Sequence, residues 1–158
     1  MALDPDTFRA VLGRFASGVT IVTTRVGSAD FGMTVSSFCS LSLDPPLVVA
    51  CIDKTAEMHD LLTADRRIVV NILSASQEAL SRRFSEELGA RRFDGVGFTR
   101  DRNGTVLLDD VLAWLDCRVA QQHDGGDHTL VVAAVDGATT RDVRPLLYYR
   151  GGYAELER

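Results

Sequence analysis

The chain has 158 residues, of which 46% are hydrophobic and 25% charged, with a formal net charge of -5 at pH 7. This length and composition predict one globular domain over residues 1–158 with a core of its own. The negative charge argues against nucleic acid as the main partner, because neutralising phosphates takes a basic surface. No apolar run approaches the ~20 residues of a membrane-spanning helix, and the acidic N-terminus lacks a secretory leader. We therefore expect a cytoplasmic protein with no membrane partner.

A helix is predicted at the start of the chain. Asp4 suits the N-cap and Pro5 the first helical position, where a missing N–H costs nothing. Apolar residues then follow the i, i+3, i+4, i+7 spacing of one buried face, namely Phe8, Val11, Leu12 and Phe15. Gly18 is expected to end this helix.

Two strands follow, VTIVTTRV over 19–26 and GMTVSSFCSLS over 32–42, with GSADFG as a turn of more than two residues between them. The second stretch is rich in hydroxyls for a strand of an apolar protein. Thr34, Ser36 and Ser40 fall on one face of an extended chain, but Ser37 falls on the other. Either the strand bulges or bends at Ser36-Ser37, or backbone groups there take part in binding.

The remaining pattern is mostly strands. LVVACI (47–52) and RRIVVNIL (66–73) read as strands around a short helix over 55–64, and Ser74 to Gln77 has capping-box spacing for a third helix. We expect a loop over 89–105, then a long hairpin of AWLDCRVAQQ and HTLVVAAVD, and a last strand at LLYY. Six or seven mostly antiparallel strands with three helices predict a mainly β fold, a closed or nearly closed barrel with flanking helices.

Several short motifs carry chemistry that the residues alone leave open. CIDKTA (51–56) leads into a predicted helix, so its free N–H groups, Lys54 and Thr55 could bind a phosphate. Equally, Asp53 or Thr55 could cap the helix while Lys54 is solvated. HDGGDH (123–128) reads better as a hairpin turn than as a metal site, and the three cysteines read as buried thiols. There is no strand–GxGxxG–helix unit and no P-loop, so neither nucleotide site is available.

Taken together in their order, the motifs resemble a known family. The blocks that carry the resemblance are FRAVLGRF, FASGVTIVTT, GMTVSSFCSLSLDPPLVVACIDKTA, RRFDGVGF, AWLDCRV, HDGGDHTLVVAAV and PLLYYRGGY. In them the chain is similar to short flavin reductases, the flavin reductase-like proteins of the FMN-binding split-barrel superfamily. These often serve as reductase components of two-component monooxygenases. The resemblance implies a six-stranded antiparallel split barrel of Greek-key type that works as a homodimer, with flavin in a groove near the dimer interface.

The resemblance also implies the site residues. The isoalloxazine and ribityl would contact Thr34, Val35, Ser36 and Ser37. The ribityl and phosphate would lie along Ser40, Cys51, Asp53, Lys54 and Thr55. The phosphate end, or the adenine of FAD, would be closed over by Arg82, Arg83 and Phe84. His128 would sit near the nicotinamide, Tyr149 belongs to the family's C-terminal pattern, and no metal is expected.

The expected activity is that of an NAD(P)H:flavin oxidoreductase that reduces FMN or FAD for a partner monooxygenase. Hydride transfer belongs to the two cofactors, so the protein needs no nucleophile, and a folded dinucleotide would need no Rossmann domain. NADH is favoured over NADPH because no basic cluster is placed for a 2′-phosphate, while FMN and FAD stay equally open. The alternative is a flavin-binding or electron-transfer module without nicotinamide turnover.

Overall fold

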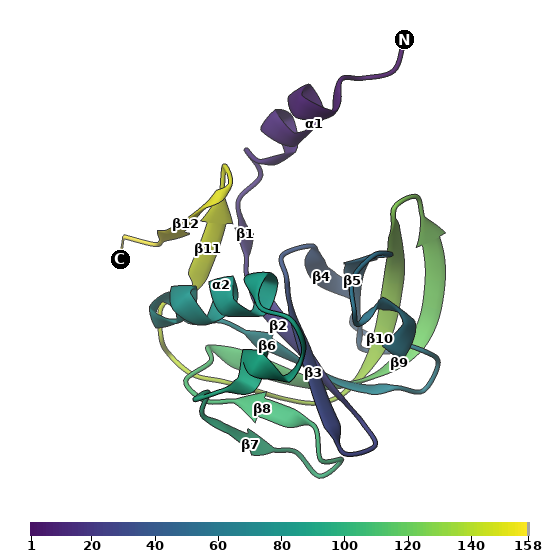
Figure 1. Cartoon of the computed structure of the whole chain (residues 1–158), viewed down its shortest axis with the longest axis vertical. Coiled ribbons are helices and arrows are strands. Elements are labelled where there is room, and N and C mark those ends of the chain that lie inside the picture. The colour runs from purple at the N-terminus through teal and green to yellow at the C-terminus, as the bar shows by residue number, and fades with distance from the viewer. Residues whose placement is uncertain (158) are drawn as a thin grey trace.

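The computed structural model describes residues 1–157, and its centre is an antiparallel sheet of seven strands (Figure 1). Across the sheet the order is β3-β2-β6-β9-β10-β5-β4. The strands are β2 (Thr20–Val26), β3 (Ala29–Val35), β4 (Phe38–Ser42), β5 (Leu47–Asp53), β6 (Arg67–Ile72), β9 (Ala113–Gly125) and β10 (His128–Thr140). The expected mainly β, antiparallel architecture is confirmed, with one strand more in the sheet than the expected six.

The opening of the barrel lies between β3 and β4. These strands follow one another in the chain, separated only by Ser36 and Ser37, yet they form the two opposite edges of the sheet. The sheet therefore curls until its edges approach each other, and the two serines connect them. Of the two alternatives for this stretch, the structure shows the first, because the strand is interrupted at Ser36-Ser37. This interruption explains why the hydroxyls do not keep to one face.

Smaller elements surround the barrel. The helices are α1 (Pro5–Leu12) and α2 (Glu78–Glu86), with short 3-10 turns η1 (His59–Leu61), η2 (Ala75–Gln77) and η3 (Gly89–Phe93). A second sheet joins β1 (Ser17–Gly18), β11 (Leu146–Tyr149) and β12 (Gly152–Glu155), and a third pairs β7 (Phe98–Arg100) with β8 (Val106–Leu108). In Figure 1, α1 projects away from the barrel, and the β11–β12 hairpin lies beside α2.

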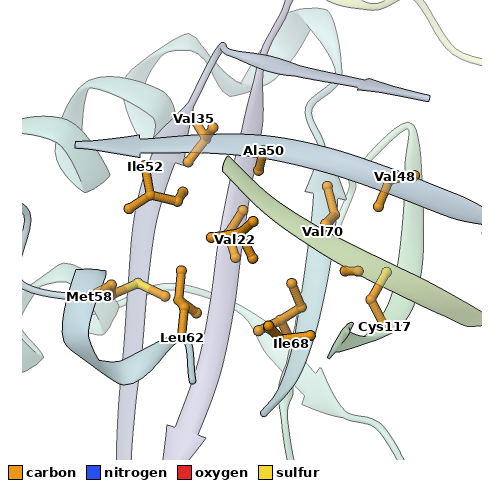
Figure 2. Close-up of a cluster of buried hydrophobic side chains, with 13 residues drawn as sticks. Val22, Val35, Val48, Ala50, Ile52, Met58, Leu62, Ile68, Val70 and Cys117 are labelled. Atoms are coloured by element: carbon orange, nitrogen blue, oxygen red, sulfur yellow. The ribbon is translucent and has the colours of Figure 1, made fainter. Parts of the chain in front are cut away.

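Two hydrophobic clusters hold these layers together. The first fills the barrel with apolar side chains such as Val22, Ile52 and Val70, together with the buried thiol of Cys117 (Figure 2). The second includes Ile21, Leu73 and Phe84 and lies outside the barrel wall, where α2 and the smaller sheets pack. Adjacent residues of β2 thus belong to different clusters, as the alternation of a strand with two covered faces requires. Each fully buried aliphatic side chain contributes about 1.5–3 kcal/mol.

The predicted first helix is correct in its start and wrong in its environment. Asp4 caps it by accepting the N–H of Thr7 at 2.9 Å, and Pro5 is its first residue. The helix ends at Leu12 with Gly13 as its C-cap, and Gly18 lies in β1 instead. The apolar face expected to be buried is open to solvent in the single chain, with Phe8 54%, Val11 62%, Leu12 51% and Phe15 81% exposed.

Three other expectations need correction. The segment 55–64 forms only the three-residue η1, because the Asp53 carboxylate accepts the N–H and hydroxyl of Thr55 and closes a local turn in place of a helical one. The segment 89–105 contains η3 and β7, so it is more ordered than a loop. The turn between β2 and β3 is two residues long, since the strand pairing continues to Val26 and Ala29.

Candidate functional site

Three cavities that share lining residues lie at the opening of the barrel, and together they are called the groove. The largest, about 700 Å³, lies between α1, β4, β5 and the second sheet. It shares Ser36 and Tyr148 with a cavity of about 220 Å³, which in turn shares Thr34 and Ser85 with a third of about 310 Å³. The end of β3 and the Ser36-Ser37 break therefore lie at the middle of this groove, between the 700 Å³ cavity and the 310 Å³ cavity.

The hydroxyl-rich stretch contributes to the groove unevenly. Thr34 lines two of the cavities and donates its hydroxyl to the carbonyl of Ser81 at 2.7 Å. Ser36 and Ser37 line the largest cavity. The side chain of Val35 is buried in the barrel core, so only its backbone is near the groove. Ser40 is exposed on β4 and is absent from the residues that line the groove within 1–157.

The end of β5 brings Asp53, Thr55 and His128 together. Asp53 and Thr55 line the 310 Å³ cavity, and His128 is paired with Asp53 in the register of β5 and β10. Hydrogen bonds from the backbone and hydroxyl of Thr55 lower the pKa of the Asp53 carboxyl, and nearby His128 lowers it further. Cys51, two residues earlier on β5, lines the largest cavity. Asp53 thus places a negative charge at this end of the groove.

Lys54 does not occupy the position expected from the sequence. Because residues 55–64 form no α-helix, there is no helix dipole at CIDKTA to attract a phosphate. The ammonium group of Lys54 instead forms an ion pair with the Asp124 carboxylate on the β9–β10 hairpin. Its charge is already balanced, and it is absent from the cavity linings within residues 1–157.

The α2 residues are held largely by contacts within the protein. Arg82 pairs with Glu78 at 2.9 Å and lies over the ring of Tyr153, 4.8 Å from its centroid. Arg83 donates to the carbonyl of Arg91 at 2.9 Å. Phe84 is fully buried, its ring edge-on to that of Phe93, although it also borders the 310 Å³ cavity. The expectation that all three close over the ligand is thus weakened most for Phe84, a core residue.

Two tyrosines that the sequence analysis did not name as site residues line the groove. Tyr148 and Tyr153 both line the 220 Å³ cavity, and the Tyr153 hydroxyl is 2.8 Å from that of Ser81 on α2. Tyr149 lies at the end of β11, is 41% exposed, and is absent from the linings within residues 1–157. The alternation along LLYY predicts that Tyr148 and Tyr149 face opposite sides of the strand, so only one of these two can face the groove.

The groove fits a flat aromatic ligand with polar edges. Its largest cavity combines Phe15, Phe38 and Val49 with the hydroxyls of Ser36 and Ser37, so an apolar ring and its hydrogen-bonding rim both find partners. No group of three or more metal-ligating side chains occurs among residues 1–157. None of the helices described over these residues is long and apolar enough to span a membrane.

Comparison with known proteins shows similarity to flavin reductases. A family model described as flavin reductase like domain matches residues 12–157. HsaB, the reductase subunit of a flavin-dependent monooxygenase from Mycobacterium tuberculosis, is 39% identical, covering 98% of this chain and 84% of the relative. SmoA, an FMN reductase (NADH) from Agrobacterium fabrum, is 38% identical, covering 96% of this chain and 86% of that protein.

The similarity extends to solved structures. The NADH:FAD oxidoreductase SgcE6 of Streptomyces globisporus, in complex with NAD and FAD fragments, superposes with a TM-score of 0.90. It is 36% identical, with 99% of this chain and 96% of that chain covered. Since sequence and fold agree over nearly the whole length, the chain belongs to the flavin reductase like family.

Proposed function

We propose that the protein is an NAD(P)H-dependent flavin reductase that supplies reduced FMN or FAD to a partner monooxygenase. The observation that carries this is the groove at the barrel opening, in a chain whose relatives are named as reductase subunits and NADH-dependent reductases. NADH is the proposed donor, because the relatives' names that specify a nicotinamide specify NADH. When both are bound, the nicotinamide supplies a hydride and the flavin ring accepts it.

The chain's own residues would act by binding and orienting. We assign the ring and ribityl of the flavin to the centre of the groove, next to Thr34, Ser36 and Ser37, where hydroxyls and backbone groups are available. Val35 would contribute through its backbone. His128 would lie beside the nicotinamide, because it is paired with Asp53 at one end of the groove and its side chain is 38% exposed. Holding two rings in reactive geometry can itself supply several kcal/mol of catalysis.

We further propose that the protein is a homodimer in the cytoplasm. The apolar face of α1, formed by Phe8, Val11, Leu12 and Phe15, has no partner within residues 1–157. Large exposed apolar patches of this kind mark association surfaces. Leu12 and Phe15 also line the largest cavity, so a second copy seated on α1 would border the groove. A cytoplasmic location would give the enzyme access to NADH.

The decisive experiment measures NADH consumption by the purified protein with FMN, FAD or riboflavin as acceptor. We expect turnover that depends on both the protein and the added flavin. The competing function, a flavin-binding module, predicts retained yellow colour without consumption of NADH or NADPH. Absence of turnover with all three flavins and both nicotinamides would therefore reject the reductase.

A further inference from the structure

The 310 Å³ cavity is lined by a buried arginine that the sequence motifs did not single out. Arg92 lies in η3 and is only 8% exposed, yet it borders this cavity together with Thr34 and Thr55. Arginine is rarely buried to this degree without an acidic partner. Its charge therefore needs an explanation.

The protein itself gives Arg92 only neutral partners. Its Nε donates to the carbonyl of Glu87 and its Nη1 to the carbonyl of Gly32, which fixes the plane of the guanidinium. Within residues 1–157, its Nη2 forms no hydrogen bond in addition to those of Nε and Nη1. Burial lowers the pKa of Arg92, and the field of Glu57, the one acidic residue that acts on it, raises the pKa without forming an ion pair. Arginine nevertheless stays protonated, so an uncompensated buried cation remains.

The other cations considered for the ligand phosphate are already engaged. Lys54 pairs with Asp124, and Arg82 pairs with Glu78. Arg83 donates to a backbone carbonyl, and its Nε is buried without a partner rather than opening to the groove. Of these four, Arg92 alone lines a cavity of the groove. The geometry thus favours Arg92 as the group that can accept an anion without breaking an existing ion pair.

We propose that Arg92 binds the phosphate of the flavin nucleotide in the 310 Å³ cavity. This rests on the proposed function, since it takes the flavin to be the ligand of the groove. A guanidinium held by two carbonyls presents its free Nη2–H groups without further loss of side-chain entropy, which suits a phosphate oxygen. The hydroxyls of Thr34 and Thr55 border the same cavity, but each already donates its proton within the protein, to the Ser81 carbonyl and to the Asp53 carboxylate. Arg92 is therefore the donor assigned to the phosphate.

Two carboxylates border the cavity as well, and they shape the expected selectivity. Asp53 and Glu57 are both exposed at its edge, so they oppose an anion that lacks a directed contact. A free phosphate ion should therefore bind weakly. The phosphate of a flavin nucleotide is carried into the cavity by the ring and ribityl, which bind elsewhere in the groove. Arg92 is thus a specificity residue that distinguishes FMN and FAD from riboflavin.

The test compares the FMN-to-riboflavin affinity ratio in three proteins, measured by quenching of flavin fluorescence. In the wild type FMN should bind at least ~10-fold tighter than riboflavin, the size expected of a charge-assisted hydrogen bond. Arg92→Met should lower the ratio at least ~10-fold. Arg91→Met, the exposed neighbour in the same turn, should leave the ratio unchanged. A ratio is insensitive to general damage, because such damage weakens both ligands alike.

Arg92→Lys covers the case in which the methionine variant does not fold. It keeps the charge and loses the planar fork, so its ratio should fall between those of the wild type and of a protein without phosphate recognition. Equal affinity of the wild type for FMN and riboflavin, or an unchanged ratio in Arg92→Lys and Arg92→Met, would overturn the proposal. NADH consumption with riboflavin as acceptor needs no phosphate, so it tests the reductase activity separately.

Discussion

At the scale of single residues, the position proposed for His128 predicts that its removal affects use of the nicotinamide and leaves flavin binding intact. It lies outside both hydrophobic clusters, its Nδ1 is 2.8 Å from the Asp127 carboxylate, and it faces Asp53 at the end of the groove. Replacing it with alanine therefore removes no core packing. We expect His128→Ala to raise the KM for NADH about 10-fold, as for a lost hydrogen bond to ligand, while flavin affinity stays within about 2-fold.

The two quantities are measured by steady-state kinetics with varied NADH and by flavin titration. His123→Ala is a matched control, because His123 lies on the same hairpin, is exposed, and has a side-chain hydrogen bond to Gln121 and none to the cavity-lining residues described over 1–157. We expect neither quantity to change in it. A parallel loss of NADH use and flavin affinity in His128→Ala would contradict the position assigned to this residue.

How far the sequence predicts the site differs from residue to residue. The hydroxyls of Thr34, Ser36 and Ser37 could be read directly, because a serine-rich strand stands out in an apolar sequence. The ion pair of Lys54 could not be predicted, because its partner Asp124 is 70 residues away in the chain. The two side chains meet only when the β9–β10 hairpin pairs with β5. The role of Arg92 could not be predicted from the sequence either. Nothing in RRF distinguishes a buried arginine from its exposed neighbour before the fold encloses it.

At the scale of elements, α1 is stabilised by its own caps and not by this chain's core. None of its residues is buried, so the helix contributes little to the stability of a single chain. We expect a Phe8→Ser, Val11→Ser double variant to keep the fold and to weaken dimer formation at least ~100-fold, because each apolar side chain buried at an interface is worth about 1.5–3 kcal/mol. Light scattering over a dilution series measures this.

Ala10→Ser provides the control on the opposite side of the same helix. It should leave the dimer unaffected. If the double variant associates as the wild type does, the apolar face of α1 is not the interface between copies.

Elements with strong local signals were predicted correctly, and those decided by tertiary contacts were not. The capping box of Ser74 and Gln77 is present, and the long hairpin of β9 and β10 lies where its alternation placed it. The apolar spacing of Met58, Leu61 and Leu62 predicts a helix over 55–64, but the chain does not form one there. Met58 and Leu62 are indeed buried, but they enter the barrel core from an irregular turn.

At the scale of the whole molecule, strand count and hairpin connections predicted a barrel, but not where it opens. That depends on β3 and β4 reaching opposite edges of one sheet, which follows from pairing with β2 and β5 rather than from any local pattern. The close packing at Gly32 shows how accurately β3 must be positioned. A Cβ at this position of β3 would lie 2.7 Å from the ring of Phe84, so the strand passes directly beneath α2.

Stability of the whole fold should depend on pH in two opposite ways. Asp116 on β9 is 6% exposed, and its Oδ1 has no hydrogen-bond partner within residues 1–157. Burial raises the pKa of its carboxyl, against the opposing fields of Arg67 and Arg102. Asp30 on β3 differs, because its hydrogen bond from Arg100 lowers its pKa. The folded state thus binds the proton of Asp116 more tightly than the unfolded state, and that of Asp30 less tightly.

The signs follow for the two asparagine variants. The contribution of Asp116 is complete below its unfolded pKa and is lost as pH rises through its folded pKa, so the Tm of Asp116→Asn relative to wild type should increase from about pH 3 to pH 7. The contribution of Asp30 is present above its unfolded pKa and is lost as pH falls, so the relative Tm of Asp30→Asn should decrease over the same range. Thermal melts of the three proteins across this range measure both slopes. Because each difference cancels the titration of every other group, slopes of the same sign would contradict the environment assigned to one of the two carboxyls.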